Sequence, residues 1–139
     1  MIRRSPGRTA PGDKRLSVVI PAFREAERIA ETVTQVRAEL APALDPGDLE
    51  VVVVDDGSGD GTAEAAASAD LVVALAHNRG KGAAVRSGML AASGRSRVFT
   101  DADLSYAPAQ IVRVLEELEA GWDLVVGNRY HHQTNTTVP

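Results

Sequence analysis

The apolar and polar residues of this chain follow two alternating patterns. Short, continuous apolar runs rich in β-branched residues are typical of strands that are covered on both faces of a sheet. The longer segments between them carry apolar residues at helical spacing, such as Ile29, Val33, Val36 and Leu40. The expected strands are residues 16–20, 50–55, 71–76, 97–101 and 123–127, and the expected helices are 27–40, a short Ala-rich segment ending at Ala69, 81–92 and a segment beginning at Pro108. This alternation predicts an α/β, Rossmann-like domain with a mostly parallel sheet flanked by helices.

Some details of these elements follow from single residues. Pro21 is expected to stop the first strand, and Pro108 suits the first turn of the last helix. The helix 81–92 is expected to pack Val85, Met89 and Ala92 against the sheet.

The length of 139 residues fits one domain, which we expect over residues 16–130. Residues 1–15 carry five basic residues against one Asp, with two Pro and two Gly, and are expected to be a disordered basic tail. This tail is either solvated or attracted to anionic lipid as a peripheral membrane contact. Residues 131–139 are expected to be an irregular C-terminal tail.

Composition excludes several classes of function. The absence of Cys excludes disulfides, thiol chemistry and zinc–thiolate sites. A formal charge of −4 without a dominant basic face argues against nucleic acid as a partner. No uninterrupted apolar stretch approaches the ~20 residues of a membrane helix, so we expect a cytoplasmic protein, with the cytoplasmic face of a membrane as the alternative.

Two acidic clusters follow expected strands. Asp55 and Asp56 come directly after four valines, and Asp101 and Asp103 follow the run that ends at Thr100. In open parallel sheets, ligands bind beyond the carboxyl ends of the strands. The first cluster continues with three Gly in five residues, which let the backbone approach a ligand. Either Asp could instead cap the next helix, although Asp60 or Thr62 is better placed for that.

The Asp101-Ala102-Asp103 segment has an i, i+2 spacing that suits Mg²⁺ or Mn²⁺ bridging a diphosphate. Its alternative is a surface turn. A third motif, Asn78-Arg79-Gly80-Lys81-Gly82, begins a helix, where backbone N–H groups attract anions, and Arg86 follows on the first turns. Its alternative is a polar loop with a solvated helix face.

Together these motifs resemble the family 2 glycosyltransferases of GT-A fold. The resembling segments are 18–27, 51–62, 78–88 and 101–105, and Gly127-Asn128-Arg129 is similar to a later Gly-Ser-Arg segment of the family. The third and fourth motifs are most similar to polyprenyl- and dolichyl-phosphate sugar synthases, especially glucosyltransferases. A haloacid-dehalogenase-like phosphatase or a receiver domain would need a Lys after these motifs, and none follows Lys81.

The resemblance implies a site for a nucleoside-diphosphate sugar, with UDP-glucose favoured over GDP-mannose. It places Pro21, Ala22, Phe23 and Glu25 beside the base and lets Asp55 or Asp56, next to Gly57, bond uracil or guanine. Asn78, Lys81 and Ala102 complete the binding set. Asp101 would face the ribose and diphosphate, and Asp103, Asp101 and Ser105 would hold the metal.

The reaction implied is an inverting, metal-dependent transfer to a polyprenyl phosphate. Asp103, Lys81 and Arg86 are its expected catalytic residues, because they or the metal they hold would offset charge on the departing diphosphate. The resemblance covers only the donor half, and the family's acceptor half lies beyond Pro139. We therefore expect donor binding with negligible transfer, the alternative function being a non-catalytic nucleotide-sugar-binding module. The open sheet edge of such a truncated domain favours a homodimer.

Overall fold

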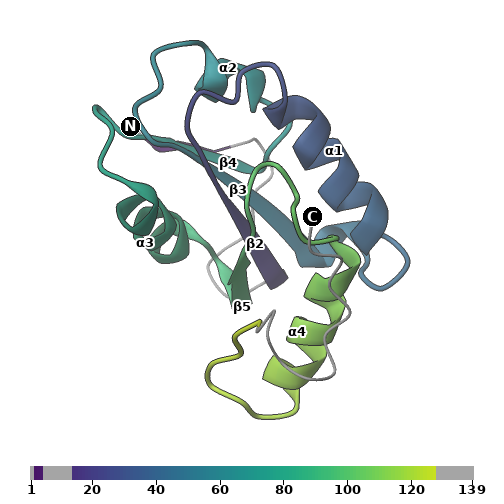
Figure 1. The fold of residues 1–139 in the computed structure, drawn as a ribbon. Helices are drawn as coiled ribbons and strands as arrows, with labels where there is room; N and C mark the ends of the chain where they lie inside the picture. Colours follow the sequence, from purple (N-terminus) through teal and green to yellow (C-terminus); the bar gives the residue numbers. More distant parts are fainter. Residues whose placement is uncertain (1, 5–13, 128–139) are drawn as a thin grey trace, which may run out of the picture.

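A computed structural model describes residues 2–4 and 14–127, and its centre is a five-stranded sheet (Figure 1). The strands lie in the order β1-β4-β3-β2-β5. β2 to β5 pair in parallel, and β1 pairs with β4 in antiparallel fashion. Their bounds are Ile2–Arg4 for β1, Lys14–Ala22 for β2, Leu49–Asp55 for β3, Leu71–Ala74 for β4 and Gly94–Phe99 for β5. The predicted α/β fold with a mostly parallel sheet is confirmed.

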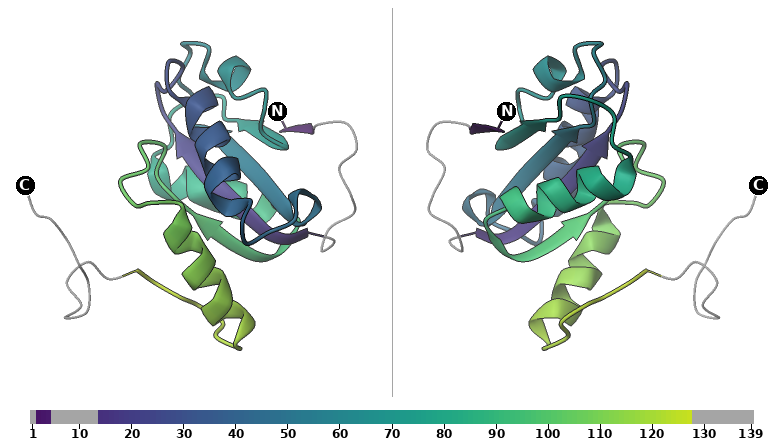
Figure 2. Two further views of the ribbon diagram at one scale, coloured as in Figure 1. Left: turned by 90° about the vertical axis from the view of Figure 1, so that its right-hand side faces the viewer. Right: turned by 90° about the vertical axis from the view of Figure 1, so that its left-hand side faces the viewer.

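Helices cover both faces of this sheet (Figure 2). The bounds are Ile29–Leu40 for α1, Thr62–Ala65 for α2, Lys81–Ala91 for α3 and Ala109–Glu119 for α4, with a 3₁₀ turn, η1, at Pro46–Asp48. α1 and α4 pack on the face that carries Val18 and Ile20 of β2. α3 packs on the opposite face, against Val19 of β2 and Val52 of β3. Alternate residues of β2 therefore feed two separate apolar cores.

α3 packs through small residues in addition to the predicted Met89 and Ala92, which both belong to the apolar cluster on this face, whereas the predicted Val85 does not. Ala84 and Gly88 are its buried residues, whereas Val85 and Met89 are only half-buried. A Cβ atom at Gly88 would lie 2.3 Å from a methyl carbon of Val19. The missing side chain thus allows the helix to approach the sheet closely, which an apolar periodicity search overlooks because Gly carries no hydrophobic signal.

The predicted end of the first strand at Pro21 is wrong, because β2 continues to Ala22 and Pro21 pairs in register with Val54. The carbonyl of Val19 accepts from Thr100 on the β5 side, so Pro21, two residues later, faces the same side. β5 has already ended at Phe99, opposite Val19. The missing N–H of Pro21 therefore removes no ladder hydrogen bond.

The strand predicted at 123–127 is not formed among the described residues. Leu124 and Val126 are 77% and 75% exposed, and the segment lies in no sheet. Apolar β-branched residues favour extended backbone, but a strand also needs a neighbouring edge to satisfy its N–H and C=O groups. Among the described residues, β5 has a neighbour on one side only, and the segment 123–127 does not pair with its other side.

The N-terminal boundary also differs from the prediction. Ile2–Arg4 form β1 against β4, and β2 already begins at Lys14, so β1 and the first two residues of β2 lie within the segment predicted as a disordered tail at 1–15. The segment of β1 forms a strand despite its polar composition, because the edge of β4 offers backbone N–H and C=O groups that any extended segment can pair with. Residues 128–130 of the predicted domain and the predicted tail at 131–139 lie outside the described residues.

A buried carboxylate ties the amino-terminal ends of three strands together. Glu50 of β3 is fully buried and accepts hydrogen bonds from the Ser17 hydroxyl and from the N–H and hydroxyl of Ser93. The Ser17 hydroxyl in turn accepts from the N–H of Gly94, at the start of β5. This polar cluster lies at the end of the sheet opposite to the strand ends Ala22, Asp55 and Phe99.

Candidate functional site

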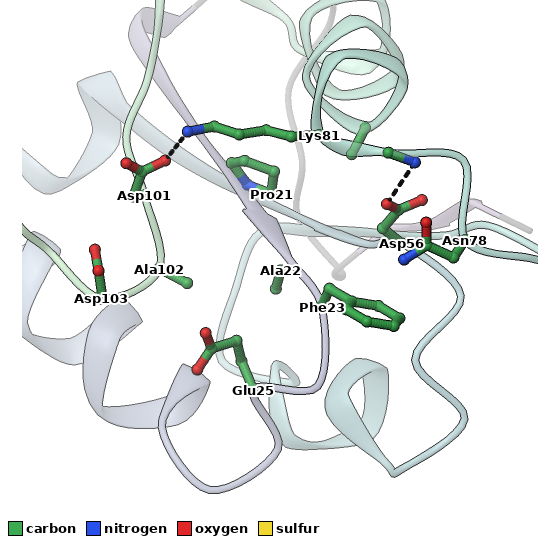
Figure 3. A pocket seen from close by; sticks show the side chains of 12 residues that line it. Pro21, Ala22, Phe23, Glu25, Asp56, Asn78, Lys81, Asp101, Ala102 and Asp103 are labelled. Atoms are coloured by element: carbon green, nitrogen blue, oxygen red, sulfur yellow. Dashed lines mark hydrogen bonds and ion pairs between the residues drawn. The ribbon is translucent and has the colours of Figure 1, made fainter.

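A pocket of about 320 Å³ lies where the parallel strands end (Figure 3). Its lining comes from the end of β2 and the turn after it, the loops that follow β3 and β4, the first turns of α3, and the turn after β5. These segments meet because the carboxyl ends of parallel strands share one edge of a sheet. The lining residues are Pro21, Ala22, Phe23, Glu25, Asp56, Asn78, Gly80, Lys81, Ala84, Asp101, Ala102 and Asp103.

Asp56 joins the loop after β3 to the start of α3. Its two carboxylate oxygens accept from the backbone N–H groups of Arg79 and Gly80, at 2.8 and 2.9 Å. Gly57 has φ +70°, and a Cβ atom there would lie 2.2 Å from the backbone of His77. The two loops are therefore in direct contact, and the negative charge of Asp56 lies beside the helix N-terminus, where it is favourable.

The same loop holds the turn that follows β2. The Ser58 hydroxyl accepts from the N–H of Arg24 at 2.8 Å, and the Thr62 hydroxyl accepts from the N–H of Glu25 at 3.1 Å. These bonds fix the segment that carries Phe23. The Phe23 ring lines the pocket and is half-exposed. The guanidinium carbon of Arg24 lies 5.0 Å from the centre of this ring. The Asp-Asp-Gly-Ser motif is thus the link between the two neighbouring loops.

Asp103 is held by a small turn of its own. One of its oxygens accepts from the hydroxyl of Ser105 at 2.7 Å and from the Ser105 N–H at 3.1 Å. The hydroxyl bond first, and then the backbone bond, hold the pKa of Asp103 below its usual range. Leu104 has φ +51°, which is uncommon for a residue with a side chain, and its N–H donates to the carbonyl of Asp101. The turn is therefore closed in a form that keeps Asp103 ionised.

Thr32 of α1 is a positioning residue that the sequence patterns missed. Its side chain is buried, and its hydroxyl donates to the carbonyl of Ala102 at 2.7 Å, across 70 positions of the chain. The signal was present, because Thr32 lies in the apolar stripe of α1 between Ile29 and Val33, where a hydroxyl needs a partner. This bond fastens the Asp101–Asp103 turn to the helix beneath it.

Lys81 reaches across the pocket to Asp101 (Figure 3). Its ammonium forms an ion pair with one Asp101 oxygen and lies 5.9 Å from the centre of the Phe99 ring. Both partners are partly exposed, with 57% of the Lys81 side chain and 37% of the Asp101 side chain accessible. The pair is therefore formed at the surface of the pocket, where water can replace either partner.

The charges that line the pocket favour a cation. Four carboxylates, from Glu25, Asp56, Asp101 and Asp103, face one ammonium, from Lys81. Carboxylate oxygens are the ligands that Mg²⁺ and Mn²⁺ prefer. Within residues 14–127, no group of three or more acidic or His side chains is close enough to hold a metal alone. A cation at Asp101 and Asp103 would therefore need further oxygen atoms from water or from a ligand.

The structure brings together most of the predicted site residues, but not all. Asp55 does not line the pocket, and its carboxylate accepts from the N–H of Ser58. Gly57 and Arg86 are also outside the lining, Arg86 being exposed farther along α3. Ser105, predicted as a metal ligand, is likewise absent from the lining because its hydroxyl is directed to Asp103. Gly80, from the motif predicted to attract anions, and Ala84, which was not a predicted site residue, also line the pocket.

Comparison with known proteins identifies the family of this chain. Residues 17–138 match the sequence profile described as Glycosyl transferase family 2. The chain is 32% identical over 127 residues to the undecaprenyl-phosphate 4-deoxy-4-formamido-L-arabinose transferase of Yersinia enterocolitica, covering 86% of this chain and 38% of that protein. It is 36% identical over 135 residues to the dolichyl-phosphate beta-glucosyltransferase of Drosophila melanogaster, covering 84% and 41%.

Two solved structures share the fold. The mannosyltransferase PcManGT of Pyrobaculum calidifontis, in complex with GDP-Man and Mn²⁺, is 33% identical with a TM-score of 0.58, covering 71% of this chain and 31% of that one. The glucosyl-3-phosphoglycerate synthase of Mycobacterium tuberculosis, in complex with Mn²⁺, UDP-glucose and phosphoglyceric acid, is 29% identical with a TM-score of 0.58, covering 78% and 40%.

The chain matches only a part of each relative. It spans about two fifths of the length of the two curated proteins from Yersinia and Drosophila. Separately, none of the helices in the described part of the chain is both long and apolar enough to cross a membrane.

Proposed function

Because the chain belongs to glycosyl transferase family 2, we propose that its pocket binds a nucleoside-diphosphate sugar and presents the sugar for transfer to a polyprenyl phosphate. The observation that carries this proposal is the convergence of three kinds of group in one cavity: an aromatic ring with polar neighbours, a helix N-terminus with a lysine, and a pair of carboxylates. Those groups match the three parts of the donor, namely the base, the diphosphate and its counter-cation.

The base belongs at the end lined by Phe23, Asp56 and Asn78. The Phe23 ring offers a face for stacking. Each Asp56 oxygen already accepts one backbone hydrogen bond, and a carboxylate oxygen can accept two, so a base N–H can still bind there. Asp56 is preferred to Asp55 for this role because only Asp56 lines the pocket. The two solved structures above contain UDP-glucose and GDP-Man, and we favour UDP-glucose over GDP-mannose because a dolichyl-phosphate beta-glucosyltransferase is among the relatives.

The diphosphate belongs at the start of α3. Gly80 and Lys81 line the pocket there, and the first N–H groups of a helix attract anions. Lys81 adds a mobile positive charge that can follow the phosphates as they depart. Arg86 is placed outside the lining, so we assign it the weaker role of a long-range charge on the same helix.

Asp101 and Asp103 would hold a divalent cation, Mg²⁺ or Mn²⁺, because both carboxylates line the pocket and Asp103 is kept ionised by Ser105. When bound, such a cation would offset the negative charge that develops on the leaving nucleoside diphosphate. Ser105 acts in this proposal by orienting Asp103 rather than as a ligand. The Thr32 hydroxyl supports the same turn from below.

The acceptor class is proposed from the names of the relatives, which include undecaprenyl-phosphate and dolichyl-phosphate sugar transferases. A lipid phosphate is already anionic near neutral pH, so it needs little help from a general base and can attack the sugar directly with inversion. A phosphate at the end of a lipid would bring the chain to a membrane surface, where the basic residues near the N-terminus would favour anionic lipid.

The test is a calorimetric titration of UDP, GDP and UDP-glucose, each with Mn²⁺ and with a chelator. We expect the wild type to bind UDP and UDP-glucose more tightly with Mn²⁺. Asp103→Ala should lose that difference between metal and chelator. Asp123→Ala, which removes an exposed carboxylate outside the pocket lining, is the matched control and should keep it. Metal-dependent affinity that survives in Asp103→Ala would refute the assignment of the cation to this turn.

A further inference from the structure

The two carboxylates proposed to hold the cation are in different states. Asp103 is fixed within its own turn by two hydrogen bonds from Ser105. Asp101 instead forms an ion pair with the Lys81 ammonium, which comes from a different element of the fold. A cation approaching this edge of the pocket thus meets one carboxylate that is oriented for it and one that already has a positive partner.

The side chain of Lys81 is suited to leave Asp101. It is more than half exposed, and its ammonium lies as far as 5.9 Å from the centre of the Phe99 ring. Exposed ion pairs of this kind contribute little net stability, so the energy needed to separate them is small. Lys81 is also the first residue of α3, next to Gly80, and its extended side chain carries the charge across the pocket, so rotation about its side-chain bonds can bring that charge back toward the helix N-terminus.

We propose that Lys81 is an internal counter-ion that occupies Asp101 when the pocket is empty and transfers to the diphosphate when the donor binds, which frees Asp101 for the metal. This inference rests on the proposed donor function and adds an order of events to it. Metal alone must compete with Lys81 for Asp101 and meets its positive charge, so it should bind weakly. Donor and metal together should bind with positive coupling, because the donor removes the competitor.

Coupling of this kind is reciprocal and can be measured from either ligand. Lys81→Met keeps the aliphatic length of the side chain and removes the charge. It should bind Mn²⁺ alone about three- to tenfold more tightly than the wild type, because a like charge a few ångströms away is removed. The same variant should bind UDP more weakly and should show a smaller gain in UDP affinity on addition of Mn²⁺.

The experiment measures free Mn²⁺ by electron paramagnetic resonance during titration of the protein with the metal alone, and then repeats the titration with saturating UDP. Lys14→Met is the matched control, since Lys14 is the other lysine of the chain and binds the Gly47 carbonyl at the far end of β2. It should behave as the wild type. Lys81→Gln provides a second neutral variant, and circular dichroism confirms that both are folded.

The gain in Mn²⁺ affinity should disappear in the double variant Lys81→Met/Asp101→Asn, because no carboxylate remains to be freed. The proposal is overturned if both neutral Lys81 variants bind Mn²⁺ alone no more tightly than the wild type, or if the gain persists without the Asp101 carboxylate. Because these titrations contain Mn²⁺ without UDP, they test the role of Lys81 independently of donor binding. Absence of any UDP binding by the wild type would instead refute the donor function.

Discussion

Replacement of Asp56 by Asn tests the role that the structure gives to the Asp-Asp pair. Asp56 is 4% exposed and accepts two backbone N–H groups, one at each oxygen, from Arg79 and Gly80. Asn has a single side-chain oxygen, so one of these N–H groups keeps its acceptor and the other faces an amide NH₂ group. The substitution therefore removes one charge-assisted hydrogen bond. It also places the side-chain NH₂ group against a backbone N–H in a buried position, where neither donor has an acceptor.

The size of the effect can be worked out from these contacts. A hydrogen bond to a charged group contributes about 1.5–3 kcal/mol, so we expect Asp56→Asn to lower the free energy of unfolding by about 2–3 kcal/mol. Asp55→Asn is the matched control, because one Asp55 oxygen accepts from the Ser58 N–H and an amide oxygen can replace it. That variant should lose about 1 kcal/mol or less.

Urea unfolding followed by far-ultraviolet circular dichroism measures both variants. With a denaturant dependence of about 1–3 kcal/mol per molar urea, the midpoint of Asp56→Asn should fall by about 1–2 M, and that of Asp55→Asn by much less. If Asp56→Asn instead unfolds at the midpoint of the wild type, the bonds between Asp56 and the loop before α3 do not stabilise the fold.

Three further substitutions test other contacts. Thr32→Val should weaken Mn²⁺-dependent UDP binding several-fold while Thr32→Ser restores it, as measured by calorimetry, because only the hydroxyl holds the turn between the two pocket carboxylates. Gly88→Ala should destabilise the fold by about 1–3 kcal/mol in urea through overpacking. Gly82→Ala on the same helix should be neutral or stabilising, because the new methyl would meet nothing within 4 Å beyond its chain neighbours and the local helix backbone. A hydrogen bond from Arg15 lowers the pKa of Glu119. Glu119→Gln should therefore be less stable than the wild type above about pH 4.3, the usual pKa of Glu. This difference in stability should disappear as the pH falls through the lower pKa of Glu119 in the folded protein. A difference that is unchanged at low pH contradicts the ion pair.

The architecture could be predicted because it depends on local signals. The valine runs that became β3 and β4 and the apolar stripe of α1 identify their elements without knowledge of the rest of the chain. Asp56, Lys81 and the Asp101–Asp103 turn were predicted to share a site because parallel strands end at one edge, and the pocket does bring them together.

The remaining features depend on partners distant in sequence. The hydrogen bond between Thr32 and the Ala102 carbonyl and the burial of Glu50 beneath Ser93 both join residues more than 40 positions apart. No pattern of hydrophobicity encodes such a pair. The segment 123–127 shows the reverse case, since its composition favours a strand but it pairs with no strand of the described sheet, although the outer side of β5 has no partner there.

We propose that one pocket at the strand ends binds a nucleoside diphosphate together with a divalent cation. The most direct test of this proposal is a map of amide chemical shifts by two-dimensional nuclear magnetic resonance, recorded as UDP and Mg²⁺ are added to the labelled protein. We predict that the largest changes fall at residues 21–25, 56–58, 78–82 and 101–105, and that the amides around Glu50 and Ser93, at the opposite end of the sheet, do not change. Absence of any change at saturating ligand, or changes centred on that opposite end, would contradict the account.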